Sequence, residues 1–249
     1  MLTCLFSSRV QDNPDSQISL FLSSVLACVD NPKDKIEFII KYDSDDSQIP
    51  DDDFFNEYPF SIKRIVMARG EGRHSIHLDH MYCFAQRDLR SRFIMIGSDD
   101  FIFNRPGFID DILNIKDEIC VVGYAKPRVD LYKNKWQDPT MIEVWKHNEG
   151  VCLPCFSVKF IEIVQNFGWQ CNTDNWQTLL TILMYEKYNI DIFKTISPFY
   201  SRNPTLGNSG YSKTYNNMEI DGSRNCQNKY YFNLVEQQAK NLALNIKYG

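Results

Sequence analysis

The sequence has no excess of basic charge and no apolar run long enough to cross a membrane. Its 249 residues carry 27 Lys and Arg against 32 Asp and Glu, and the formal net charge of −5 argues against general nucleic-acid binding. The longest apolar run, residues 18–29, is about half of a membrane span. The apolar stretch 1–6 is too short for the hydrophobic region of a signal peptide, and no positively charged segment precedes it. We therefore expect a cytoplasmic protein without a transmembrane segment.

Glycine and proline are also few, with 11 and 10 residues, and the sequence contains no internal repeat. Together with 43% hydrophobic residues, this composition excludes a collagen-like or disordered chain and indicates an ordered globular domain. The eight cysteines would allow four disulfides, but they are scattered and several lie in apolar runs, which favours reduced, buried thiols. Cys152 and Cys155 form a lone Cys-x-x-Cys without a second pair, which is weak evidence for a zinc or redox site.

The first 125 residues alternate strand-like and helix-like segments with short connections, which is typical of an α/β sheet. Strands are predicted at 2–7, 36–42, 62–67, 93–96, 119–124, 151–156 and 190–196. Helices are predicted at 18–29, 106–115, 158–166, 176–188 and 231–246, and after residue 73 with an apolar face of Leu78, Met81, Tyr82, Ala85 and Leu89. The last helix would bury Tyr231, Val235, Ala239, Leu242 and Ile246. The acidic run 45–57 is predicted to be a solvated loop, and 126–150 is long enough to be functional.

Asp99 and Asp100 follow directly on the apolar strand 93–96. The nearest basic residues, Arg92 and Arg105, are too far along the chain for local pairing of both carboxylates. Adjacent like charges at a strand end favour a bound divalent cation or sugar hydroxyls, although an Asp-Asp turn facing water is the alternative. Ligands gather at the strand ends of α/β sheets, so we favour the binding site.

Other strand ends carry groups of the same kind. Ser8 and Arg9 follow the first strand, and Asp43 follows the second, which would suit the base, ribose and phosphate of a nucleotide. Arg69 and Arg73 flank two glycines before a helix, where backbone amides, the helix dipole and two guanidinium groups would share a pyrophosphate. An ordinary strand-to-helix turn with solvated arginines is equally compatible with that segment.

This order of strands, with Asp43, Arg69-Gly-Glu-Gly-Arg73 and Ser98-Asp99-Asp100 at their ends, resembles the nucleotide-sugar half of a GT-A glycosyltransferase of the family 2 type. The resemblance implies a Rossmann-like mixed sheet flanked by helices and a nucleotide-sugar donor, with a UDP-sugar favoured. It also implies that Asp43 holds the base and that Asp100, helped by Asp99, holds Mn²⁺ or Mg²⁺ on the diphosphate. Ser98 stands where the family has the first Asp of its Asp-x-Asp motif, which leaves the metal dependence open.

The second half of the chain offers candidates for the acceptor side. Asp174 resembles the general base that family 2 enzymes carry before a later helix, although a helix N-cap gives the same pattern. Arg202, with Tyr211 and Lys213, lies in a polar segment that would close over a diphosphate as a lid. Trp136 and Trp145 would suit either a stacking wall for a sugar or a buried anchor. We expect His74, His77 and His80 to be solvated rather than zinc ligands.

These features predict one α/β domain with a C-terminal extension. Residues 1–200 would form the GT-A-like domain, with 1–125 as its nucleotide-sugar half and 126–200 as its acceptor half, and 201–249 would form a lid segment and a helix. The expected reaction is transfer of a sugar from a nucleoside-diphosphate donor to a glycan or other hydroxyl acceptor, with inversion. The alternatives are a nucleotidyltransferase on the same sheet and a degenerate domain that binds a sugar or nucleotide without turnover. The last helix would pack on the core or pair with a second copy in a homodimer.

Overall fold

The fold is built on a mixed seven-stranded sheet in the order β3-β2-β1-β4-β7-β6-β8. The computed structural model describes residues 1–8, 14–46, 49–70, 72–97, 101–124, 155–167, 173–202 and 229–249. The strands of the sheet are β1 (Leu2–Ser7), β2 (Ile36–Asp43), β3 (Ser61–Met67), β4 (Phe93–Ile96), β6 (Val121–Gly123), β7 (Cys155–Ser157) and β8 (Phe193–Thr195). A second, two-stranded sheet pairs β5 (Phe101–Phe103) with β9 (Tyr200–Arg202) in antiparallel fashion.

Four neighbouring strands of the large sheet, β3, β2, β1 and β4, run parallel to one another. Strand β7 is antiparallel to both β4 and β6, and β8 is parallel to β6. The parallel strands therefore end at one edge of the sheet, where Ser7 pairs with Lys41 and Asp43 pairs with Met67. We call this edge, defined by Ser7, Asp43, Met67 and Ile96, the carboxyl edge. Polar groups that follow these strands are brought together there.

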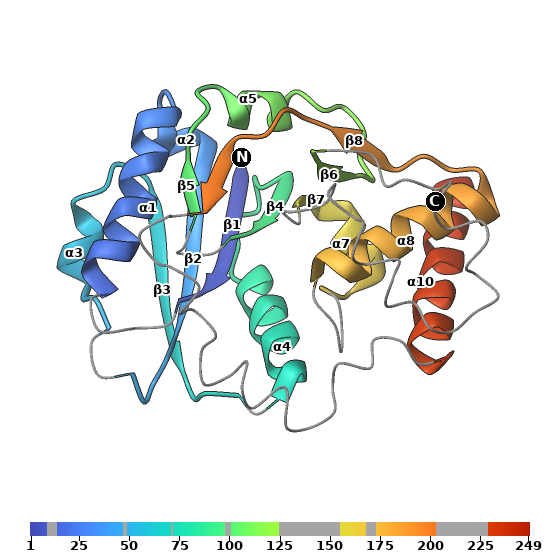
Figure 1. Ribbon diagram of the computed structural model, residues 1–249, viewed down its shortest axis with the longest axis horizontal. Helices are drawn as coiled ribbons and strands as arrows, with labels where there is room; N and C mark the ends of the chain where they lie inside the picture. The colour runs from blue at the N-terminus through green and yellow to red at the C-terminus, as the bar shows by residue number, and fades with distance from the viewer. Residues whose placement is uncertain are drawn as a thin grey trace.

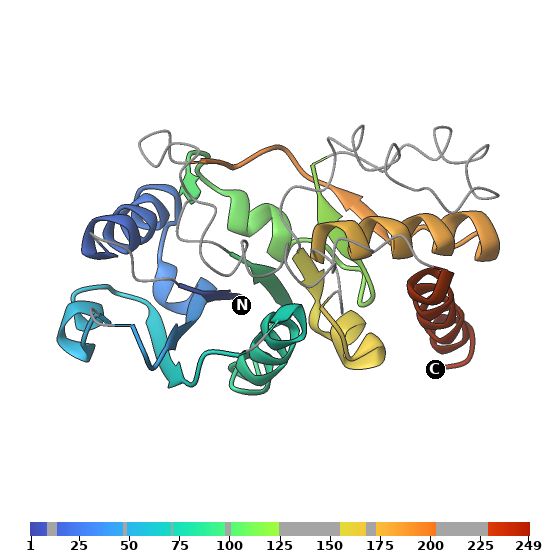
Figure 2. The same ribbon diagram turned by 60° about the horizontal axis from the view of Figure 1, so that its bottom comes forward.

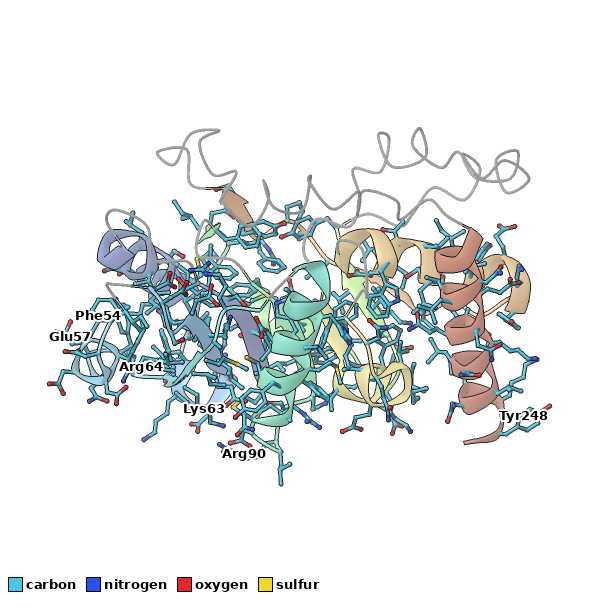
Figure 3. The ribbon with its side chains drawn as sticks, turned by 90° about the horizontal axis from the view of Figure 1, so that it is seen from below. Phe54, Glu57, Lys63, Arg64, Arg90 and Tyr248 are labelled. Carbon is cyan, nitrogen blue, oxygen red and sulfur yellow. The ribbon has the colours of Figure 1, made fainter. Side chains whose placement is uncertain are left out.

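Helices cover both faces of the sheet. They are α1 (Pro14–Cys28), α2 (Pro32–Lys35), α3 (Asp52–Asn56), α4 (Gly72–Ala85), α5 (Phe108–Leu113), α7 (Val158–Val164), α8 (Thr173–Tyr188) and α10 (Lys229–Tyr248). Figure 1 shows α3 and α10 at opposite ends of the molecule, and Figure 2 shows α1 and α4 on opposite sides of the strands. Phe54 and Glu57 mark the α3 end in Figure 3, and Tyr248 marks the α10 end.

The alternation of side chains along the strands creates two hydrophobic cores. Leu5 of β1 and Ile39 of β2 belong to the core that contains residues of α4, α7, α8 and α10, which we call the α4-side core. Phe6 and Phe38 point the other way, into the α1-side core, where the ring of Phe21 lies 5.2 Å from that of Phe6. Successive residues of a strand face opposite sides of the sheet, so strands with continuous apolar sequence are required in this three-layer arrangement.

The expected mixed α/β sheet flanked by helices is confirmed, and the structure adds elements that the sequence pattern did not indicate. The short elements α2, α3, β5 and β9 were not expected. The acidic run 45–57 was expected to be a solvated loop, which is wrong for α3, because Asp51 caps this helix by accepting from the Phe54 amide at 3.0 Å and Phe55 is buried. Of the predicted strand 151–156, residues 151–154 lie outside the described part of the chain.

The predicted face of α4 is also wrong, except at Met81, which packs against the α4-side core. Leu78, Tyr82 and, beyond the helix, Leu89 are exposed. The buried side chains of the helix are Asp79, His80, Cys83 and Phe84, so the helix is turned by about one residue from the expected orientation. By contrast, the predicted face of α10 is confirmed at Val235, Ala239 and Leu242, which are fully buried.

Cysteines of the described residues are free thiols in the interior: Cys4, Cys28, Cys83, Cys120 and Cys155. Burial raises the pKa of the Cys83 and Cys120 thiols to about 12, which keeps them protonated at neutral pH. Among the helices of the described residues, none combines the length and apolar character that a membrane crossing requires.

Candidate functional site

Backbone hydrogen bonds hold the segments after the parallel strands close to one another. The Ser8 amide donates to the Lys41 carbonyl at 2.9 Å, and the Ser44 amide donates to the Met67 carbonyl at 2.8 Å. On the other side of β1, the Gly97 amide donates to the Leu5 carbonyl at 2.8 Å. A Cβ atom at Gly97 would lie 2.6 Å from the Cys4 sulfur, so glycine is required for this close approach of β4 to β1.

A cluster of charged side chains lies at the carboxyl edge around Asp43. It consists of Lys41, Asp43, Asp45, Asp46, Arg69 and Asp79, and we call it the Asp43 cluster. Lys41 Nζ binds Asp43 Oδ1 and also lies 3.0 Å from Asp79 Oδ2. Arg69 Nη1 lies 2.8 Å from the other oxygen of Asp43. Both carboxylate oxygens of Asp43 are therefore paired with a cation in this structure.

Arg69 joins the loop after β3 to the loop after β2. Its Nε lies 3.0 Å from Asp45 Oδ2 and its Nη2 lies 2.9 Å from Asp46 Oδ1. The hydrogen bond from Arg69 lowers the pKa of the Asp45 carboxyl. Asp45 and Asp46, which were expected to be merely solvated, thus neutralise the guanidinium that the sequence assigned to a pyrophosphate.

Lys41 has the most buried charge of the cluster, with 3% of its side chain exposed. Burial alone lowers the pKa of its ammonium group, but hydrogen bonds to Asp43 and Asp79 outweigh this effect and raise the pKa. The group therefore remains charged at neutral pH. An ammonium group this deep in a protein needs close carboxylates to offset the loss of hydration, and Asp43 and Asp79 provide them.

Three carboxylates of the cluster have the chemistry of a divalent-cation site. Ligand oxygens of Asp43, Asp45 and Asp46 all lie within 4.8 Å of one another. Carboxylate oxygens are the ligands that Mg²⁺ and Mn²⁺ prefer, so the donor set fits such an ion by type. In this structure, Arg69 forms an ion pair with each of the three. Asp99 and Asp100, the predicted metal ligands, lie outside the described residues.

Of the two histidines whose side chains are described, His80 is buried, contrary to expectation, whereas His77 is half-buried. His77 Nδ1 accepts a hydrogen bond from the Phe167 amide at 3.2 Å. His80 is buried, and its ring packs edge-on against Phe167 with 5.9 Å between the ring centroids. Burial, with smaller contributions from the charges of His77 and Lys41, lowers the pKa of His80 to about 4. These histidines connect α4 to the end of the segment that follows α7.

The structure brings some of the predicted site residues together and leaves others apart. Asp43 and Arg69 form an ion pair, and the backbone of Ser8 is bonded to the strand that carries Asp43. Arg73 and Asp174 lie in the first turns of α4 and α8, so Asp174 is inside its helix rather than in front of it. Arg202 is the last residue of β9. The remaining candidates, Arg9, Asp99, Asp100, Trp136, Trp145, Tyr211 and Lys213, lie outside the described residues.

Sequence reasoning missed Lys41 and Asp79. The signal for Lys41 was its position in a strand that is otherwise apolar, where a charged side chain facing a core needs a buried partner. Asp79 had no comparable local signal, because it lies 38 residues further along the chain on a helix face that was assigned to solvent.

No protein-family model matches the chain, and no curated protein matches it by sequence. Among solved structures, the fragment 1–349 of TarS from S. aureus, a GT-A glycosyltransferase, superposes with a TM-score of 0.52 at 12% identity, covering 98% of this chain and 72% of the fragment. The same fragment in complex with UDP gives the same values. Another structure of S. aureus TarS gives a TM-score of 0.50 at 12% identity, covering 94% of this chain and 42% of TarS. The likeness shows that this chain has a GT-A glycosyltransferase-like fold.

Proposed function

We propose that this protein is a glycosyltransferase that moves a sugar from a nucleoside-diphosphate donor, a UDP-sugar, to a hydroxyl of a glycan or another acceptor. The observation that carries the proposal is the Asp43 cluster at the carboxyl edge of a GT-A-like sheet. Ligands of open α/β sheets bind at this edge. The TarS fragment of the same fold has been crystallised with UDP.

In the proposed donor site, the carboxylate of Asp43 accepts a hydrogen bond from an N–H of the base. Ser8 and Arg9, after the neighbouring strand, contact the nucleoside and its phosphate. Arg69, Arg73 and the amides at the start of α4 bind the diphosphate, since a helix N-terminus and guanidinium groups both favour anions. Arg202 approaches the diphosphate from the C-terminal segment. A Mn²⁺ or Mg²⁺ ion held by Asp99 and Asp100 would neutralise negative charge on the departing diphosphate.

Asp174 is the proposed general base. Its carboxylate accepts the proton of the acceptor hydroxyl while the hydroxyl oxygen forms a bond to the anomeric carbon. The bond between that carbon and the diphosphate oxygen breaks, the nucleoside diphosphate leaves with the bonding electron pair, and the configuration at the anomeric carbon inverts.

The test begins with ligand binding. UDP and UDP-sugars should raise the melting temperature of the protein, with a larger rise in the presence of Mn²⁺, because a ligand that binds only the folded state stabilises it. Asp43→Asn should weaken UDP binding, and Asp53→Asn, on the exposed surface of α3, should leave it unchanged. Sugar transfer is then measured as UDP release with a panel of glycan acceptors.

Asp174→Asn separates binding from chemistry. This variant should bind UDP as the unaltered protein does but lose at least about a hundredfold in transfer rate, which is the usual contribution of a general base. The proposal is wrong if no nucleoside diphosphate or nucleotide sugar stabilises the protein. Release of pyrophosphate from a nucleoside triphosphate would instead identify a nucleotidyltransferase, and tight UDP binding without transfer would identify a binding domain.

A further inference from the structure

Lys41 faces α4 because of its place in the strand. Residues 37, 39, 41 and 43 of β2 share one face, and Ile39 on that face belongs to the α4-side core. Lys41 is nevertheless a charged side chain that is 3% exposed. Burying this charge is expensive, since the desolvation of an ammonium group costs several kcal/mol that close ion pairs only partly offset.

The orientation of α4 places the carboxylate of Asp79 against Lys41. The helix buries Asp79 and leaves Leu78 and Tyr82 exposed at 63% and 49%. The buried face of the helix also includes His80, Cys83 and Phe84, so Asp79 lies beside apolar side chains of the core. The helix therefore keeps a carboxylate 3.0 Å from the Lys41 ammonium while two apolar side chains remain exposed.

The two oxygens of Asp43 have different environments. Oδ1 is bound from inside by Lys41, whose position is fixed in turn by Asp79. Oδ2 is bound at 2.8 Å by Arg69, whose side chain is 38% exposed and also pairs with Asp45 and Asp46. Arg69 can leave Oδ2 and still keep two carboxylate partners at the surface. Lys41 is buried, and without Asp43 it would keep only Asp79.

We propose that Lys41 and Asp79 are positioning residues for Asp43: they anchor one of its oxygens so that the other is presented to the N–H of a bound nucleobase in place of Arg69. This inference rests on the proposed function and deepens it. Asp79 and Arg73 lie on the same helix, so α4 connects the base site to the proposed diphosphate site. Arg69, released from Asp43, remains beside the same site.

The test compares Lys41→Met, Asp79→Asn, Asp43→Asn and the double variant Lys41→Met/Asp79→Leu, using UDP as the probe in calorimetric titrations. Lys41→Met should lower UDP affinity about tenfold, which corresponds to about 1.4 kcal/mol. Asp79→Asn, which keeps the shape of the side chain, should lower it in the same direction. In the Asp43→Asn background, Lys41→Met should have no further effect, because a positioning residue acts through its partner.

The double variant separates positioning from stability. Replacing a buried ion pair with apolar side chains often restores or raises stability, so Lys41→Met/Asp79→Leu should unfold at a higher temperature than Lys41→Met. Its UDP affinity should nevertheless remain low. Lys63→Met is the control and should leave UDP affinity unchanged. Lys63 of β3, labelled in Figure 3, pairs at 3.4 Å with the buried Glu37, which lies near the other end of β2 from Asp43.

UDP affinity equal to that of the unaltered protein, in the double variant or in Asp79→Asn, would overturn the positioning role while leaving the proposed function intact. If Lys41→Met does not fold, Asp79→Asn and the double variant decide the question. An unaltered protein that binds neither UDP nor a UDP-sugar would overturn the proposed function and the positioning role together.

Discussion

His80 of α4 lies in the interior against Phe167, and its buried Nδ1 has no hydrogen-bond partner among the described residues. Burial lowers its pKa from 6.5 to about 4, and the charges of His77 and Lys41 contribute to this decrease. Between these two pH values the unfolded chain binds a proton that the folded protein excludes. The free energy of unfolding should therefore fall as the pH is lowered from about 7 to 4, by up to roughly 3 kcal/mol from this group.

The measurement is chemical denaturation at pH 7.5, 6 and 5 for the unaltered protein and for His80→Phe, which keeps an aromatic ring and cannot titrate. The difference in unfolding free energy between pH 7.5 and 5 should be smaller in His80→Phe. An equal difference in both proteins would show that His80 is not excluded from protonation in the folded state.

At the scale of helices and strands, most of the sheet could be predicted because its strands are largely apolar segments with clear ends. The orientation of α4 could not be predicted, because Leu78 and Tyr82 satisfy the helical period, whereas Asp79 is buried only because Lys41 faces it from β2. This ion pair joins residues far apart in the chain, which no local pattern reveals. For the same reason, only part of the candidate site could be predicted. Asp43 and Arg69 were predicted because they lie at strand ends in the sequence, whereas Lys41 and Asp79 were missed because only tertiary packing brings them together.

Helix α10 was predicted from its period, and its docking provides a test at this scale. Leu242 is fully buried in the α4-side core, and the helix is also held by the indole of Trp176, which donates to Gln238 Oε1 at 2.9 Å. Leu242→Ala should lower the free energy of unfolding by about 2–5 kcal/mol, through lost burial and a cavity. Leu244→Ala, two residues along the same helix and 46% exposed, is the matched control and should change it by less than about 1 kcal/mol. Equal effects of the two substitutions would contradict the observed packing of α10.

For the whole molecule, the important feature is that the two cores are the two sides of the same strands. Leu5 and Phe6 are neighbours in β1, yet Leu5 belongs to the α4-side core and Phe6 to the α1-side core. The parallel strands are long-range pairings, so neither core can form fully unless the strands are aligned. Losing either core would expose one whole face of the sheet. We therefore expect the described elements to unfold as one cooperative unit.

This cooperativity is tested with one substitution in each core. Val25→Ala in α1 and Leu242→Ala in α10 should each lower a single melting transition, by about 4–8 °C for every 2 kcal/mol lost. Far-UV circular dichroism and tryptophan fluorescence should give the same midpoint in each variant. If UDP binds at the carboxyl edge, it should raise that midpoint in both variants by similar amounts, because the ligand stabilises the common folded state. Two separate transitions, with Val25→Ala shifting one and Leu242→Ala the other, would mean that the two cores unfold independently.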